Sequence, residues 1–209
     1  MSKLLYIEAS PRKSRSKSIE VSQVFLSEMQ RTHPSVEIDN LDLWTAELPA
    51  FDGDTVDAKY AILHGQPLTP DQAKAWKRVE TVIERFKSAD GYLFSLPMWN
   101  FGIPYVLKHL IDVVVQPGLT FGYSPTEGYK GLLTNKKAVV VYARGGAYGP
   151  GTGMEGYDLQ SKALSGILGF IGITDVNSIF VEPTIAAPDD VATTVAKAKE
   201  LAVSAAQSL

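Results

Sequence analysis

A nine-residue segment near the N-terminus has the composition of a phosphate-binding loop. Ser10–Ser18 contains four serines and four cations and lies between an apolar run and a helical pattern. Helix N-termini present unpaired N–H groups and the positive end of the helix dipole, and both favour a phosphate. The glycine-rich turn of pyrophosphate sites is missing, so the segment favours a monophosphate over a dinucleotide. The candidate ligands are Ser10, Ser16, Lys17 and Ser18; the alternative is a solvated basic loop in which Ser18 only caps the helix.

A second candidate segment, Pro97–Pro104, is rigid and partly aromatic. It holds two aromatic residues, a methionine, an asparagine and a glycine between two prolines. Such a ledge suits a flat aromatic ligand, with backbone N–H and amide groups at its polar edge. The alternative is ordinary packing of the two aromatic rings in the core. The candidate residues are Pro97, Met98, Trp99, Asn100 and Phe101.

A third candidate segment, Ala143–Gly153, is rich in glycine, which lets a backbone approach a ligand closely. Its candidate residues are Ala143, Arg144, Gly145 and Gly146, and the alternative is a flexible surface loop. The overlapping stretch Gly151–Gly156 spells GxGxxG, but it does not directly follow a strand. We therefore predict no dinucleotide site there.

The predicted strands and helices determine where these three segments lie in the fold. Apolar runs predict strands over 4–9, 36–43, 91–96, 138–142 and 174–181, and helical periodicity predicts helices over 18–31, 70–87, 104–115, 158–170 and 189–207. We expect residues 45–69 to form an excursion with at most one helical turn, and residues 117–134 an irregular or hairpin insertion. Alternating strands and helices indicate an α/β protein of one domain over residues 1–209. The expected fold is flavodoxin-like, a doubly wound five-stranded parallel sheet with helices on both faces. Ligands bind such sheets beyond the carboxyl ends of the strands, where the three segments begin.

Composition narrows the functional classes. The chain of 209 residues has a net charge of −3, which argues against general nucleic-acid binding. It has no cysteine, so disulfides, thiolate metal sites and cysteine nucleophiles are excluded. The three histidines lack the spacing of metal ligands, and no metal site is predicted. No apolar run approaches 18 residues, so we expect no membrane association and a cytoplasmic protein.

The combined motifs resemble the FMN-dependent NADH:quinone oxidoreductase and azoreductase family. The resemblance rests on Ser10 with Ser16–Ser18, Pro97–Phe101, Ala143–Gly146 and Leu168–Ile173, and it extends over nearly the whole chain. It implies a homodimer with one bound FMN per subunit and an active site at the dimer interface. It also implies NADH or NADPH as electron donor, and quinones and azo compounds as acceptors.

The resemblance assigns roles to individual residues. Ser10 and Ser16–Ser18 would hold the FMN phosphate, Met98–Phe101 would border the isoalloxazine ring, and Ala143–Gly146 would contact its pyrimidine side. The aromatic residues expected to wall the substrate pocket, partly from the partner subunit, are Tyr123, Tyr148 and Phe170. Two positions depart from the family pattern, since Ala143 stands where Ser or Thr is frequent and Trp99 where Tyr is common.

The resulting prediction is an enzyme that transfers two electrons by a ping-pong mechanism, with the chemistry on the flavin rather than on a catalytic side chain. The alternative is a flavin-bearing electron carrier with no small-molecule substrate of its own, although carriers tend to be smaller and more acidic. A phosphoester hydrolase is a third possibility, but the sequence offers no Cys, carboxylate cluster or metal site for it.

Overall fold

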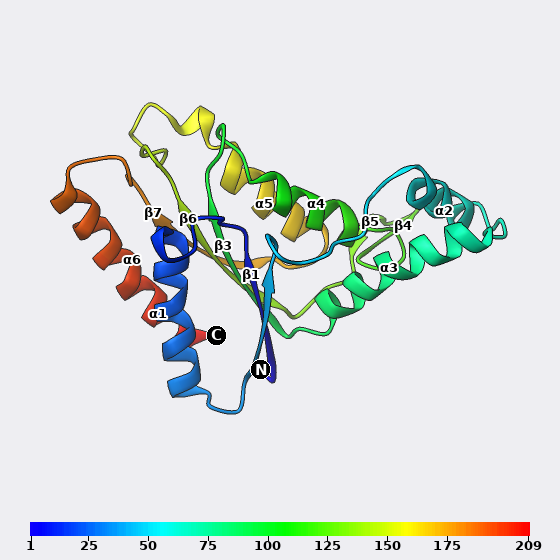
Figure 1. The fold of residues 1–209 in the computed structure, drawn as a ribbon, viewed down its shortest axis with the longest axis horizontal. Helices are drawn as coiled ribbons and strands as arrows, with labels where there is room; N and C mark the ends of the chain where they lie inside the picture. The colour runs from blue at the N-terminus through cyan, green and yellow to red at the C-terminus, as the bar shows by residue number, and fades with distance from the viewer.

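The computed structural model describes residues 1–209 as a parallel sheet between two layers of helices (Figure 1). The sheet has five strands in the order β2-β1-β3-β6-β7, and every neighbouring pair is parallel. Numbered among themselves, these strands have the 2-1-3-4-5 order of flavodoxin-like folds, so the predicted fold class is confirmed. The strands are β1 (Lys3–Glu8), β2 (Glu37–Asp42), β3 (Gly91–Pro97), β6 (Lys137–Ala143) and β7 (Asp175–Val181).

The central strands are buried on both faces because their side chains alternate between two apolar cores. In β1, Leu5 and Ile7 point into one core, and Leu4 and Tyr6 into the other. This is why the central strands are continuous apolar runs rather than alternating patterns.

Five helices form the two covering layers. Helices α1 (Lys17–Thr32) and α6 (Pro188–Ser208) cover one face, and α3 (Pro70–Lys87), α4 (Tyr105–Val114) and α5 (Leu159–Phe170) cover the other (Figure 1). The bounds of α3 agree with the prediction because its start is strongly encoded. Thr69 and Gln72 form a reciprocal capping box around Pro70.

Two helical predictions are wrong. Residues 53–63 form a full helix, α2 (Gly53–Leu63), where at most one turn was expected. Its buried residues are the small Thr55, Ala58 and Ala61, so no stripe of large apolar residues marked it. Helix α1 begins at Lys17, and its cap is Ser16 rather than Ser18, because the Ser16 hydroxyl accepts from the Ile19 N–H at 3.4 Å.

The insertion after α4 is a hairpin, which is one of the two forms predicted for it. Strands β4 (Phe121–Ser124) and β5 (Gly128–Gly131) pair antiparallel. The hairpin packs against the C-terminal end of α5, where a Cβ at Gly131 would collide with the Gly172 backbone nitrogen. Helices α4 and α5 begin at the carboxyl ends of the strands and run antiparallel to them. The hairpin, which packs at the C-terminal end of α5, therefore lies near the amino ends of the strands. None of the helices has the length and apolar character that a membrane crossing requires.

Candidate functional site

The structure brings the three candidate loops together at the carboxyl edge of adjacent strands. They follow β1, β3 and β6, which are neighbours in the sheet. Hydrogen bonds continue past the strand ends, since the Ala9 N–H donates to Ser95 O at 2.9 Å and the Met98 N–H donates to Ala143 O at 2.9 Å. Each loop is therefore held at its root by its neighbour.

The first loop forms a cradle of neutral donors. Ser10, Ser16 and Ser18 are all buried, and the hydroxyls of Ser16 and Ser18 lie 3.1 Å apart. The N–H groups of Lys17 and Ser18, in the first turn of α1, have no partner within the protein. Buried donors without a partner are costly, and an anion at this helix N-terminus would satisfy them.

The cations of this loop divide into two pairs with different environments. The Lys13 ammonium contacts Glu8 at 2.5 Å and Asp42 at 2.6 Å, and Lys17 contacts Glu20 at 2.8 Å. Partial burial alone would lower the pKa of Lys13, but hydrogen bonds to Asp42 and Glu8 outweigh that effect and raise it. The exposed Arg12 and Arg15 are in no ion pair. Lys13 thus fastens the loop to the ends of β1 and β2, Lys17 is paired within α1, and the two arginines supply the uncommitted positive charge.

The second loop is a tight turn with an unusual backbone. Asn100 and Phe101 have φ values of +47° and +67°. Trp99 and Gly102 exchange two backbone hydrogen bonds, of 3.1 and 2.9 Å, around them. The N–H groups of Asn100 and Phe101 have no partner within the protein, so the turn offers two donors beside an aromatic ledge.

Aromatic rings flank this turn on both sides. Trp99 lies against Trp44 and Tyr105, with ring centroids 5.9 and 6.2 Å away. Phe101 lies 6.2 Å from Tyr148, so the turn also contacts the third loop. The packing alternative for Trp99 and Phe101 is only half right, since each keeps more than a third of its surface exposed.

The third loop contains the largest departure from the expected role of a side chain. Arg144 is 1% exposed, and its guanidinium donates to Asp158 at 2.9 Å, Gln160 at 3.0 Å and Glu182 at 3.3 Å. It also lies over the ring of Phe180, 4.3 Å from its centroid. Every donor face of this guanidinium is directed into the protein, so Arg144 can meet a ligand only through its neighbours in the chain.

Those neighbours, Gly145 and Gly146, retain free donors. Their N–H groups have no partner within the protein, whereas the Gly145 carbonyl accepts from the Ile185 N–H at 3.1 Å. Together with the serine cradle and the Trp99–Gly102 turn, they complete a set of donors at one edge. Hydroxyls and helix N–H groups suit a phosphate, while paired backbone N–H groups suit the polar edge of a planar ring. The donors present fit FMN.

The three predicted pocket aromatics do not lie together. Tyr148 is beside Phe101 at the carboxyl edge. Phe170 and Tyr123 lie in the hairpin region, where Tyr129 bridges them with ring centroids 5.6 and 5.0 Å away. Within one chain, Tyr123 and Phe170 therefore stand away from the three loops.

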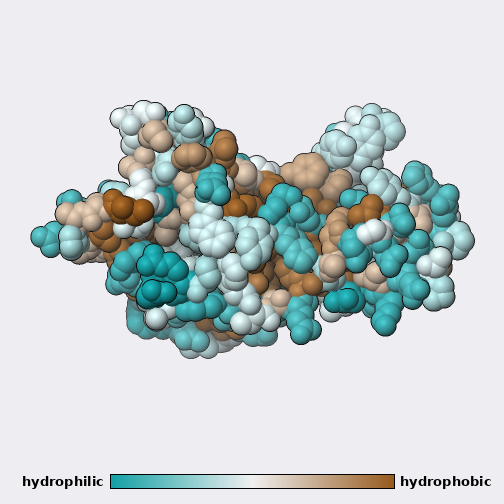
Figure 2. Space-filling model, turned by 45° about the horizontal axis from the view of Figure 1, so that its top comes forward, coloured by the Kyte–Doolittle hydropathy of each residue, from teal (hydrophilic) through white to brown (hydrophobic).

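A groove of about 740 Å³ runs beside these rings, between α2, α4 and α5. Small Ala163 and Gly166 form its floor, Ile111 and Phe170 add apolar surface, and Lys59 and Lys162 line it as well. Figure 2 shows hydrophobic surface gathered in the concave middle of the molecule, with hydrophilic surface around it.

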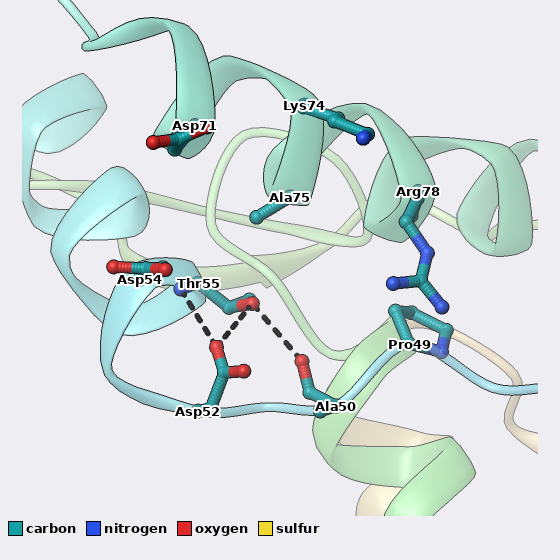
Figure 3. A pocket seen from close by; sticks show the side chains of 9 residues that line it. All are labelled: Pro49, Ala50, Asp52, Asp54, Thr55, Asp71, Lys74, Ala75 and Arg78. Carbon is teal, nitrogen blue, oxygen red and sulfur yellow. Dashed lines mark hydrogen bonds between the residues drawn. The ribbon is translucent and has the colours of Figure 1, made fainter.

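A second hollow, of about 230 Å³, lies between α2 and α3 (Figure 3). Two of its polar residues have structural partners, since Asp52 accepts from the Thr55 N–H at 3.2 Å and the Thr55 hydroxyl donates to Ala50 O at 3.0 Å. These bonds cap α2, and the hollow is remote from the strand ends that carry the three loops.

The residues that sequence reasoning missed are the carboxylates behind the loops, namely Glu8, Asp42, Asp158 and Glu182. A signal for one of them was available. Parallel register pairs Ala143 with Val181, which places Glu182 next to Arg144. An arginine at the end of a buried strand requires such a partner.

The fold and the site define the class as a flavodoxin-like α/β protein with donors for a phosphorylated planar group at its carboxyl edge. A family described as having a flavodoxin-like fold matches residues 2–205. The chain is 48% identical to the FMN-dependent NADH:quinone oxidoreductase of Desulfotalea psychrophila, over 100% of this chain and 98% of that one. It is also 48% identical to the corresponding protein of Nitratidesulfovibrio vulgaris, over 92% of this chain and 91% of that one.

Solved structures agree with these relatives. The azoreductase from Bacillus anthracis Sterne superposes with a TM-score of 0.90 at 31% identity, covering 100% of both chains. An FMN-dependent NADH-azoreductase from Bacillus anthracis Ames Ancestor, solved with FMN, gives 0.88 at 29% identity, covering 99% of this chain and 100% of that one. The chain belongs to the family of FMN-dependent NADH:quinone oxidoreductases and azoreductases.

The Arg144 cluster predicts a specific acid sensitivity. Burial alone would raise the pKa of Asp158, but hydrogen bonds from Ser161 and the charge of Arg144 outweigh it and lower that pKa. A carboxylate with a lowered pKa stabilises the fold only while it is ionised. Asp158→Asn should therefore cost about 1–3 kcal/mol near neutral pH, and this gap should shrink as pH falls below about 4.

Urea unfolding of the wild type and Asp158→Asn at several pH values measures this gap. Asp57→Asn is the matched control, because Asp57 is exposed and makes no ion pair. A gap that stayed constant down to pH 3 would show that Asp158 is not held ionised by this cluster.

Proposed function

We infer that this protein is an FMN-dependent oxidoreductase that transfers two electrons from NADH, or NADPH, to quinones and azo compounds. The convergence of three donor-bearing loops at adjacent strand ends carries this conclusion. The names of its relatives specify FMN, NADH and quinone, and those of its structural neighbours azo compounds. A nicotinamide donor is a metabolite of the cytoplasm, which favours that compartment.

FMN, when bound, supplies the electron-transfer chemistry. The first loop would hold its phosphate through Ser10, Ser16 and Ser18 and the free N–H groups of α1. The second loop, from Pro97 and Met98 to Phe101, would border the ring and keep water from one side of it. Gly145 and Gly146 would place two N–H donors where negative charge develops during reduction.

Donor and acceptor would both stack on the same exposed face of the flavin beside Trp99. Donor and acceptor would therefore occupy the same place in turn, which gives ping-pong kinetics. No side chain of this site is placed as a nucleophile, and protons can come from water.

A second copy of the chain would complete the pocket. Tyr123 and Phe170 lie away from the three loops of their own chain; Phe170 lines the groove between α2, α4 and α5, and Tyr129 connects it to Tyr123. Two copies joined along this groove would bury its apolar surface. Tyr123 and Phe170 could then wall the pocket of the partner subunit, as the family resemblance implies.

An anaerobic titration tests the function. After incubation with FMN and desalting, the protein should keep a flavin spectrum that NADH bleaches and a quinone or an azo dye restores. Spectra recorded in a sealed cuvette measure each step. Retained flavin that NADH cannot bleach would instead indicate an electron carrier, and no retained flavin would overturn the cofactor assignment.

The double substitution Ser16→Ala and Ser18→Ala should weaken FMN binding much more than it weakens the fold. Hydrogen bonds to a charged group contribute about 1.5–3 kcal/mol each, so the loss of two should raise the FMN Kd by at least on the order of 100-fold. The lost cap should cost only about 1 kcal/mol. Flavin fluorescence gives the Kd, and Ser14→Ala, an exposed serine of the same loop, is the control. Normal flavin retention by the double variant would refute the phosphate assignment.

Ala163→Glu should convert a dimer into monomers by placing a charge in the floor of the groove. Sedimentation velocity should show half the mass, and quinone reduction should fall because the pocket lacks the partner's aromatics. Ala196→Glu, on exposed surface of α6, is the control and should remain dimeric. A fully active wild-type monomer would contradict the assembly.

A further inference from the structure

Glu182 connects Arg144, the buried residue at the start of the third loop, to Tyr148 in the glycine-rich part of that loop. It follows the last residue of β7, and its side chain is 15% exposed. One carboxylate oxygen, Oε2, accepts from Arg144 Nη1 at 3.3 Å and from the Tyr148 backbone N–H at 3.2 Å. Arg144 is itself fixed by Asp158 and Gln160.

The glycine-rich loop has few other attachments. The Ile185 N–H donates to the Gly145 carbonyl, which fixes the start of the loop. The Gly151 N–H donates to Glu155, but both residues belong to the outer part of the same excursion. Between these points, the bond from Tyr148 to Glu182 is the hydrogen bond that joins the loop to the sheet. A Cβ at Gly149 would lie 3.4 Å from the other oxygen of Glu182, so the carboxylate also packs against the loop.

The need to neutralise Arg144 does not by itself explain why Glu182 is a carboxylate. Asp158 already provides a carboxylate 2.9 Å from the guanidinium, so the cluster contains two carboxylates for one cation. The second carboxylate differs from the first because it also accepts a backbone N–H from the loop that carries Gly145 and Gly146.

We propose that Glu182 is a positioning residue, which holds Gly145–Tyr148 so that the free N–H groups of Gly145 and Gly146 point at the bound cofactor. This inference rests on the proposed function, because the cofactor is FMN in that proposal. Glu182 touches neither FMN nor substrate; it acts through the backbone of the loop. Its contribution is to fix in advance the direction of two donors, so that they need not reorient as the ring becomes negatively charged.

The test compares Glu182→Ala with Glu182→Gln in the full chain. Alanine removes the acceptor, whereas glutamine removes the charge but keeps an acceptor oxygen for the Tyr148 N–H. Glu182→Ala should raise the Kd of oxidised FMN about tenfold. It should weaken the binding of reduced FMN by a further factor of ten, which lowers the two-electron midpoint potential of the bound flavin by about 30 mV. Glu182→Gln should restore the Kd of oxidised FMN to within threefold of the wild-type value and the midpoint potential to within about 15 mV of it.

Glu155→Ala is the matched control, since it frees a backbone N–H in the outer part of the same loop. It should leave the Kd and the potential unchanged. If Glu182→Ala and Glu182→Gln fall together in affinity and in the melting temperature of the apoprotein, Glu182 is only a counter-charge and the proposal is wrong. Wild-type affinity and potential in Glu182→Ala would also overturn it.

Amide hydrogen exchange of the apoprotein separates this proposal from the proposed function. Exchange of the Tyr148 amide, whose N–H donates to Glu182, should be at least tenfold faster in Glu182→Ala and unchanged in Glu182→Gln and Glu155→Ala. Faster exchange in a protein that binds no FMN would refute the proposed function while supporting Glu182 as the residue that orders the loop. Unchanged exchange would overturn the proposal whether or not FMN binds.

Discussion

A buried guanidinium constrains the whole carboxyl edge of this protein. An arginine with 1% of its surface exposed requires partners for its charge and its five donors, because an unpaired buried charge costs several kcal/mol. Arg144 has two carboxylates for its charge and makes three hydrogen bonds, to Asp158 and Gln160 at the start of α5 and to Glu182 at the end of β7. Strands β6 and β7 and helix α5 are thereby joined at one point, and the glycine-rich loop starts from it.

The first loop follows the same physical rule. Lys13 joins the ends of β1 and β2 through Glu8 and Asp42, as Arg144 joins β6 to β7. In both loops a cation that seems available to a ligand is used inside the protein instead. Neutral donors, namely hydroxyls and backbone N–H groups, are left facing the ligand space. Such donors bind an anion without a buried countercharge, and they are in place before the ligand arrives.

The difference between locally encoded elements and contacts between distant residues explains what could be predicted from the sequence. The strands and the bounds of α3 were predictable because local patterns and caps encode them, whereas for residues 117–134 the sequence left an irregular insertion and a hairpin as alternatives. Helix α2 was missed because its buried residues are small, and Ser16 replaced Ser18 as a cap because the helix starts one residue earlier than the pattern suggested. The roles of Lys13 and Arg144 depend on partners that are distant in sequence, such as Glu182 for Arg144. Only the strand register brings such residues together. The sequence therefore placed Arg144 in the expected ligand-binding segment Ala143–Gly146 and counted Lys13 only among the four cations of the first loop.

The turn at Trp99–Gly102 shows how the loops stabilise one another. Phe101 has φ +67°, a conformation that costs a residue with a side chain about 1–2 kcal/mol, and glycine there would avoid this cost. The aromatic ring, however, packs against Tyr148 and Tyr157, with centroids 6.2 and 5.0 Å away. Two such pairs contribute about 1–3 kcal/mol beyond the apolar surface that they bury. The contacts with Tyr148 of the third loop and with Tyr157, which follows that loop, therefore offset the strain of the second loop.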